Sequence, residues 1–165
     1  MSEYIAIKTK HGQSVIELFR SKAPNHVQRI IDLANEGFYN GIKFHRVIDG
    51  FMVQGGCPKG NGTSGSDKPN LRAEFNDIKH VEGVISMARS NDPNSANSQF
   101  FIMLGSAPHL DGQYTAFGKV ISGMEYIHLI RKGASNNNGT VNNPDSIDEM
   151  YVCDVDGNPV TQSDL

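Results

Sequence analysis

Short stretches of alternating apolar and polar residues recur along the chain, and turn-forming residues separate them. Residues 3–9 alternate up to His11-Gly12 and residues 13–19 alternate again, which predicts an N-terminal β-hairpin. Between residues 43 and 56 two short strands are predicted, with a break at Asp49-Gly50. The remaining predicted strands are 83–88, 98–104, 114–121 and 146–155.

Two segments show helical spacing instead of alternation. Pro24 opens the first helix, and Gly37 ends it as a C-cap. The second helix is predicted over about 122–132, and the polar segment 133–144 after it is expected to be mobile. Many strands, two helices and short turns predict a closed or nearly closed antiparallel barrel with helices at its ends. The apolar face of the first helix consists of Val27, Ile30, Ile31 and Ala34.

Length and composition predict one folded domain over residues 1–165, since 38% of the residues are hydrophobic and no repeat or linker divides the chain. The chain has no stretch of about 18 apolar residues and its N-terminus has no apolar signal core. We therefore expect a cytoplasmic monomer without a membrane partner. The alternative is the mature form of an exported protein whose signal peptide has already been removed. The net charge is −3 and the longest basic run is Arg131-Lys132, which argues against a nucleic-acid partner.

The residues that could hold a metal or a cofactor are scattered. Cys57 and Cys153 have no CxxC spacing, and two reduced thiols are expected unless folding brings them together. The GxGxxG match at 60–65 is not followed by a helical pattern, which favours a surface loop over a dinucleotide site. We expect no metal and no cofactor. Five histidines without metal-ligand spacing are expected to be structural or exposed: His11, His26, His45, His80 and His128.

Polar residues interrupt two of the predicted strands. Arg46 stands inside an apolar run, where an arginine is either paired with an acid or directed into a cleft. In the strand near residue 100, Gln99 and Phe101 share one face while Phe100 faces the other side and is expected in the core. These patterns alone favour a structural role for each single residue. A hollow, lipocalin-like carrier barrel is a weak alternative, because the strands supply large side chains for the interior.

Five segments together are more specific. In chain order they are FHRVIDGFMVQGG, GTSG, SMAR, NSQFFIML and LDGQYTAFGKV. Their order and spacing resemble those of the cyclophilins over nearly the whole chain. The resemblance implies a closed eight-stranded antiparallel barrel capped by two α-helices, with the substrate in a groove on its outer face. It implies a peptidyl-prolyl cis–trans isomerase that assists protein folding, binds proline-containing peptides and stabilises a twisted amide without covalent chemistry.

The same resemblance implies roles for individual residues. Arg46 matches the catalytic arginine, and Phe51 and Gln54 accompany it among the catalytic positions. The backbone edge at Ala88 and Arg89 is implied to hold the residues that precede the proline. The remaining implied substrate-binding residues are Met52, Gln99, Phe101, His109, Leu110 and Tyr114.

Two of these positions depart from many eukaryotic members. His109 stands where they carry tryptophan, and Tyr114 where they carry histidine. Loss of the indole N–H donor implies weak binding of cyclosporin, but the arginine and the proline pocket are unaffected. A proline-peptide binding module or chaperone with incidental isomerase activity is the alternative function. Retention of Arg46 favours the enzyme, because a binding module needs only the pocket.

Overall fold

The predicted N-terminal hairpin is present. In the computed structural model, which describes residues 2–160, β1 (Glu3–Thr9) and β2 (Gly12–Leu18) pair antiparallel over their full lengths. Gly12 opens β2, and a Cβ at this position would lie 2.7 Å from the ring of Tyr126. Glycine therefore allows the aromatic ring to pack directly against the turn.

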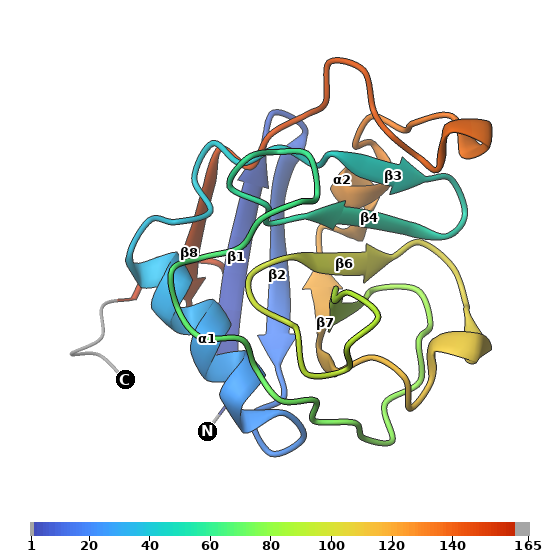
Figure 1. Cartoon of the computed structure of the whole chain (residues 1–165). Coiled ribbons are helices and arrows are strands. Elements are labelled where there is room, and N and C mark those ends of the chain that lie inside the picture. Colours follow the sequence, from blue (N-terminus) through green and yellow to red (C-terminus); the bar gives the residue numbers. More distant parts are fainter. Residues whose placement is uncertain (1, 161–165) are drawn as a thin grey trace.

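Six further strands extend this hairpin into one eight-stranded sheet (Figure 1), and each overlaps a strand predicted from the sequence. Every pairing in the sheet is antiparallel. The strand order is β3-β4-β6-β5-β7-β2-β1-β8. The six strands are β3 (Arg46–Ile48), β4 (Met52–Gly55), β5 (Val84–Met87), β6 (Phe100–Met103), β7 (Ala116–Ser122) and β8 (Glu149–Cys153).

The prediction of a closed barrel is wrong, because β3 and β8 remain the two edges of an open half-barrel. An irregular segment, 138–147, forms backbone hydrogen bonds to residues 45–47 at its start and to residues 41–44, before β3, at its end. Isolated β-bridges join this segment to the β3 side of the sheet, for example between Arg46 and Thr140. Asn138 and Asn143 have φ angles of 57° and 53°, which a β-strand cannot contain. The segment covers the exposed edge without adding a regular strand.

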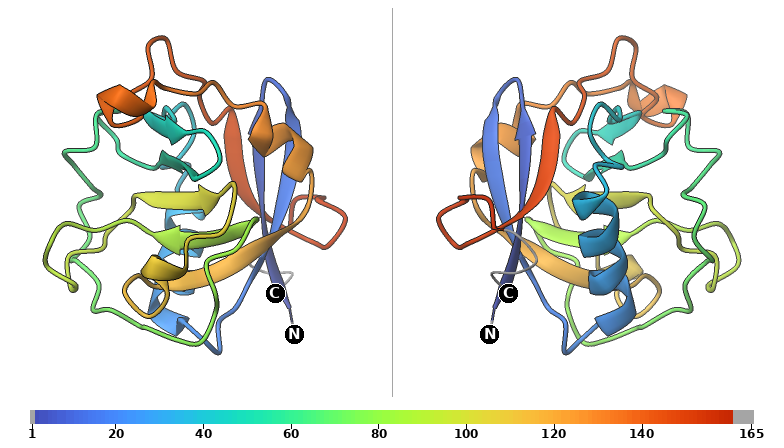
Figure 2. Two further views of the ribbon diagram at one scale, coloured as in Figure 1. Left: turned by 90° about the vertical axis from the view of Figure 1, so that its right-hand side faces the viewer. Right: turned by 90° about the vertical axis from the view of Figure 1, so that its left-hand side faces the viewer.

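Both predicted helices are present, but the second is short. Helix α1 (Pro24–Asn35) buries the predicted apolar face, whereas α2 comprises only Met124–His128. After α2 the backbone hydrogen bonds span three residues and not four, as between the N–H of Ile130 and the carbonyl oxygen of Ile127. The two helices lie on opposite sides of the half-barrel (Figure 2). Two short 3₁₀ helices complete the structure, η1 (Pro108–Leu110) and η2 (Ser135–Asn137).

Alternation along β6 separates two apolar clusters, as predicted. Phe100 and Ile102 face the interior of the half-barrel, whereas Phe101 and Met103 belong to a second cluster on its outer face. The interior is filled by large side chains, with Phe44, Phe100 and Phe117 fully buried. A hollow, lipocalin-like carrier is therefore excluded. No helix within residues 2–160 is long and apolar enough to cross a membrane.

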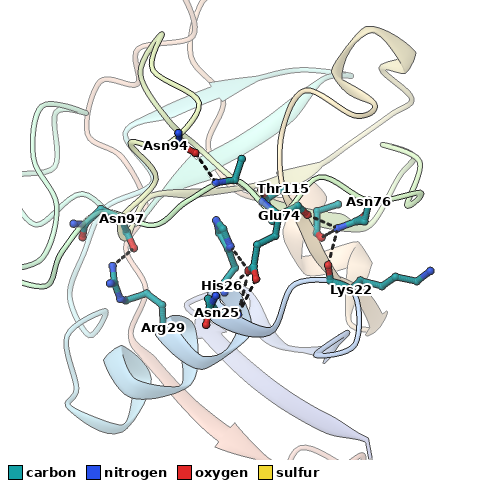
Figure 3. Close-up of polar contacts among 11 residues, drawn as sticks. Lys22, Asn25, His26, Arg29, Glu74, Asn76, Asn94, Asn97 and Thr115 are labelled. Carbon is teal, nitrogen blue, oxygen red and sulfur yellow. Dashed lines mark hydrogen bonds and ion pairs between the residues drawn. The ribbon is translucent and has the colours of Figure 1, made fainter.

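The long connection between β4 and β5 is tied to the start of α1 by Glu74 (Figure 3). Glu74 Oε1 accepts hydrogen bonds from the backbone N–H groups of Asn25 and His26, at 3.1 and 2.9 Å, and lies 2.5 Å from His26 Nδ1. The N-cap residue Ala23 makes no side-chain cap. Glu74 therefore caps a helix from which it is 48 residues distant in sequence.

Glu74→Ala should lower the free energy of unfolding by about 1–2 kcal/mol, because two helix N–H groups lose their acceptor and the helix dipole loses an anion. Urea denaturation measures this change. Glu149→Ala is the matched control, since Glu149 is exposed on β8 and should have little effect. Equal losses in the two variants would argue against the capping role.

Candidate active site

A pocket of about 330 Å³ opens on the outer face of the sheet, above the second apolar cluster. It brings together ten of the eleven residues that the sequence placed in the site. The remaining one, Gln99, lines the neighbouring compartment of the same groove. The pocket is lined by Arg46, Phe51, Met52, Gln54, Ala88, Arg89, Phe101, His109, Leu110 and Tyr114.

Strand register explains why residues far apart in sequence meet here. Arg46 on β3 is the direct partner of Gln54 on β4, and Gln54 is the partner of Phe101 on β6. Directly paired residues point to the same face of a sheet. The catalytic candidates and the pocket floor therefore share the outer face through three adjacent strands.

A chain of amide hydrogen bonds orients the arginine. Arg46 Nη1 donates to Gln54 Oε1 at 3.1 Å, and Gln54 Nε2 donates to Gln99 Oε1 at 3.1 Å. Gln99 Nε2 in turn donates to the carbonyl oxygens of Gly62 and Ser64, both at 3.0 Å. The side chain of Gln99 is thus anchored on the loop after β4, and each glutamine is fixed at both ends of its amide.

The other side of Arg46 is held by Asn138, which the sequence did not single out. Arg46 Nε donates to Asn138 O at 2.9 Å, and Arg46 Nη2 donates to Asn138 Oδ1 at 3.1 Å. The expectation of a mobile segment over 133–144 gave no role to this residue. The backbone of Asn138 is left-handed, a conformation that asparagine tolerates. This tolerance was the one feature of the sequence that could have indicated a special position here.

The guanidinium of Arg46 has no carboxylate within 4 Å in the described part of the chain. Burial lowers the pKa of Arg46 from its ordinary value, and Tyr114 acts in the opposite sense. An arginine nevertheless stays charged at neutral pH. The pocket rim therefore presents a fixed, uncompensated cation.

The floor of the pocket is apolar and aromatic. Met52, Phe101 and Leu110 are buried, and Phe51 packs beside them. The rings of Phe101 and Tyr114 meet edge to face, with their centroids 5.7 Å apart. Such a pocket suits a compact aliphatic ring better than a polar group.

A buried histidine supports this floor from behind. His80 stacks on Phe101 with ring centroids 6.1 Å apart, and its ring nitrogens lie 3.1 Å from Asp111 Oδ1 and 2.9 Å from Ser86 Oγ. Burial lowers the pKa of His80, while Asp111 opposes this effect. His80 was predicted to be structural or exposed, and the first alternative is correct: it is buried beneath the pocket.

Arg89 marks the boundary of the pocket. Its guanidinium lies 4.4 Å from the centroid of the Tyr114 ring and donates to Gln113 O from Nε, at 3.1 Å, and from Nη2, at 2.6 Å. The N–H of Ala88 is already bonded to Gln99 O. A peptide along this edge must therefore use backbone groups other than the Ala88 N–H.

The residues considered for metals and disulfides lie apart from each other. Cys57 and Cys153 are both buried and free, as expected from their spacing. Within residues 2–160 no group of three or more histidine, cysteine, aspartate or glutamate side chains is arranged to hold a metal ion.

A family model described as "Cyclophilin type peptidyl-prolyl cis-trans isomerase/CLD" matches residues 4–152. The chain belongs to this family. A probable peptidyl-prolyl cis-trans isomerase of Brucella suis is 50% identical over 154 residues, covering 87% of this chain and 79% of the relative. A peptidyl-prolyl cis-trans isomerase of Helicobacter pylori is 45% identical over 133 residues, which are 79% of this chain and 81% of the relative.

Solved cyclophilin structures share the fold. A cyclophilin type isomerase of Cryptosporidium parvum superposes with a TM-score of 0.84 at 30% identity, covering 93% of this chain and 99% of that one. Its structure in the presence of the dipeptide Ala-Pro gives a TM-score of 0.82 at 31% identity, covering 92% and 99% of the two chains. The cyclophilin-type protein described here is a peptidyl-prolyl cis–trans isomerase, which confirms the isomerase activity predicted from the five segments.

Proposed function

We propose that this cyclophilin-type isomerase rotates X–Pro bonds of protein clients by non-covalent electrostatic stabilisation, with Arg46 as the donor to the twisted amide. The observation that carries this mechanism is the position of the Arg46 guanidinium. It stands at the rim of the apolar pocket, fixed by Gln54 and Asn138 and without a carboxylate partner among residues 2–160.

The chemistry requires such a donor. Rotation about an X–Pro amide passes through a state without resonance, and its barrier is about 18–20 kcal/mol. In that state the proline nitrogen becomes pyramidal and regains a lone pair. A donor directed at this lone pair stabilises the transition state more than the planar ground state, which is the condition for catalysis.

The arginine alone is insufficient. Lowering the relaxation time from about a minute to about a millisecond corresponds to a factor near 10⁵, or about 7 kcal/mol. One charge-assisted hydrogen bond contributes roughly 1.5–3 kcal/mol. We infer that clamping the proline ring supplies much of the remainder, while the backbone on one side of the bond is held still.

The pocket is suited to that clamp. Phe51, Met52, Phe101 and Leu110 offer the apolar surface for the ring. Gln54, Gln99 and the edge at residues 88–89 lie where they can hold the preceding residues. The similar Cryptosporidium parvum protein was solved in the presence of Ala-Pro, which supports a ligand of this size and chemistry.

The cellular role is part of the same proposal. We infer a single-domain monomer that acts on proline-containing clients in the cytoplasm and assists their folding, without a cofactor. Cyclosporin should bind weakly, since His109 lacks the indole donor. A proline-peptide binding module or chaperone with incidental activity remains the second candidate, but it does not require the bonds that fix Arg46.

Exchange NMR on a short Ala-Pro peptide tests the proposal with the unmodified protein. We expect cis–trans exchange to become faster by about 10⁵-fold at saturating enzyme. Cyclosporin in a matched titration should inhibit this exchange only weakly. A folded protein that binds the peptide without accelerating exchange would favour the binding module.

A further inference from the structure

The groove does not end at the proline pocket. A second compartment of about 430 Å³, here called the polar compartment, adjoins it and shares Gln54, Ala88 and Arg89 with it. Its other walls come from the loop after β4 and from the loop before β6, and they are rich in serine and asparagine. A bound peptide that extends from the proline pocket past residues 88–89 would therefore enter the polar compartment.

The walls of the polar compartment are held firmly. Asn97 Oδ1 accepts from Ser66 N at 2.8 Å, and Asn97 Nδ2 donates to Lys68 O at 2.9 Å. Arg29 of α1 donates to Asn97 O at 3.2 Å (Figure 3). It also donates to Pro69 O at 2.5 Å. The two loops are thus bonded to each other and to the helix behind them, so the compartment is preformed.

The charge that lines this groove is opposite in sign to the net charge of the chain. The whole chain has a net charge of −3, yet no aspartate or glutamate among residues 2–160 lines the proline pocket or the polar compartment. Both linings contain cations instead, namely Arg46, Lys68 and Arg89. Cations in a half-enclosed groove attract anionic groups more strongly than the same charges on an open surface.

Arg89 is the cation best placed to select a ligand. Its hydrogen bonds go to the uncharged acceptors Gln113 O and Ser90 O, and it packs on the Tyr114 ring. These contacts fix the guanidinium without neutralising it, and no ion pair involves it in the described part of the chain. Lys68 contributes less, because it already pairs with Glu36 at 2.8 Å.

We propose that Arg89 makes this isomerase prefer clients with an aspartate or glutamate two or three residues before the proline. The inference rests on the proposed function, in which the residues ahead of the proline lie along the edge at 88–89. An extended chain advances about 3.3 Å per residue, so these side chains lie roughly 7–10 Å from the proline, at the junction of the two compartments. Three of the five N–H groups of Arg89 are already bonded, and a carboxylate there can accept from the remaining two.

The test compares peptides that carry glutamate or glutamine at the second or third residue before an Ala-Pro unit. For the wild type, kcat/KM should be about fivefold higher with glutamate than with glutamine at one of these positions, at low salt. High salt should reduce this ratio toward one. Arg89→Gln should abolish the preference for glutamate. Lys119→Gln should keep it, because Lys119 is exposed on β7 and lines neither compartment.

The outcomes separate the two proposals. The acidic preference alone would be overturned if the enzyme accelerates the glutamine peptides and the glutamate-to-glutamine ratio of kcat/KM is near one at both positions. It would also be overturned if this ratio stays high in Arg89→Gln. Folded protein that accelerates none of the peptides would overturn the proposed function. Because the readout is the ratio between two peptides, a general change in turnover caused by the Arg89 substitution does not affect the conclusion.

Discussion

Arg46→Ala should lower kcat/KM for an Ala-Pro peptide by about 10²-fold while the protein remains folded. The substitution removes the donor directed at the developing lone pair, and it leaves the apolar floor intact. Gln54 and Asn138 lose a partner at a solvent-facing rim, where water replaces the missing bonds. Exchange NMR measures the rate, and circular dichroism with thermal melting verifies the fold.

Two further variants sharpen this experiment. Arg46→Lys keeps the charge but loses the planar fork that bonds Gln54 and Asn138, so it should recover little activity. Arg72→Ala removes an exposed arginine outside the pocket and should leave the rate unchanged. Full activity in Arg46→Ala would remove this residue from the mechanism.

Phe101→Ala should raise KM strongly and lower the free energy of unfolding by about 3–5 kcal/mol. Phe101 is the pocket floor and is also buried between His80 and Tyr114, so its truncation leaves a cavity and removes the surface that holds the proline ring. Peptide titration followed by NMR gives the change in affinity, and urea denaturation gives the change in stability.

The neighbouring residue provides a matched control. Phe100 and Phe101 are adjacent on β6 but belong to the interior and the outer cluster, respectively. The milder variants Phe100→Leu and Phe101→Leu should both lose stability, yet only Phe101→Leu should weaken peptide binding. Equal binding by the two variants would contradict the assignment of Phe101 to the proline pocket.

The sequence predicted the fold and the site where local patterns are informative. Alternation near residue 100 separates Phe100 from Phe101 because side chains in a strand point alternately to its two faces. The five motif segments named the pocket residues, which strand pairing then brings together. The first result depends on short-range periodicity, whereas the pocket residues were named by the resemblance to the cyclophilins, since the patterns alone favoured a structural role for each of them.

The parts that could not be predicted depend on long-range contacts. Asn138 bonds Arg46 across 92 residues of sequence, and its tolerance of a left-handed backbone does not by itself point to the arginine. Glu74 caps α1 from another segment, which a search for a local cap cannot find. The closed barrel was expected from the number of strands and from the resemblance, but closure depends on pairing between the first and last strands of the sheet order, and β3 and β8 do not pair.

The open edge of the half-barrel has a consequence for how this enzyme can diverge. The segment 138–147 follows β3 through isolated bridges, so an insertion or deletion there does not reverse the two faces of a strand. The same segment carries Asn138, which holds two nitrogens of Arg46. We expect the fold to accept changes in length at the exposed Asn142 and Asn143, because the buried Val141 and Ile147 on either side can stay in place while the support of the arginine moves. This edge is where evolutionary drift or loop grafting would adjust turnover without rebuilding the pocket.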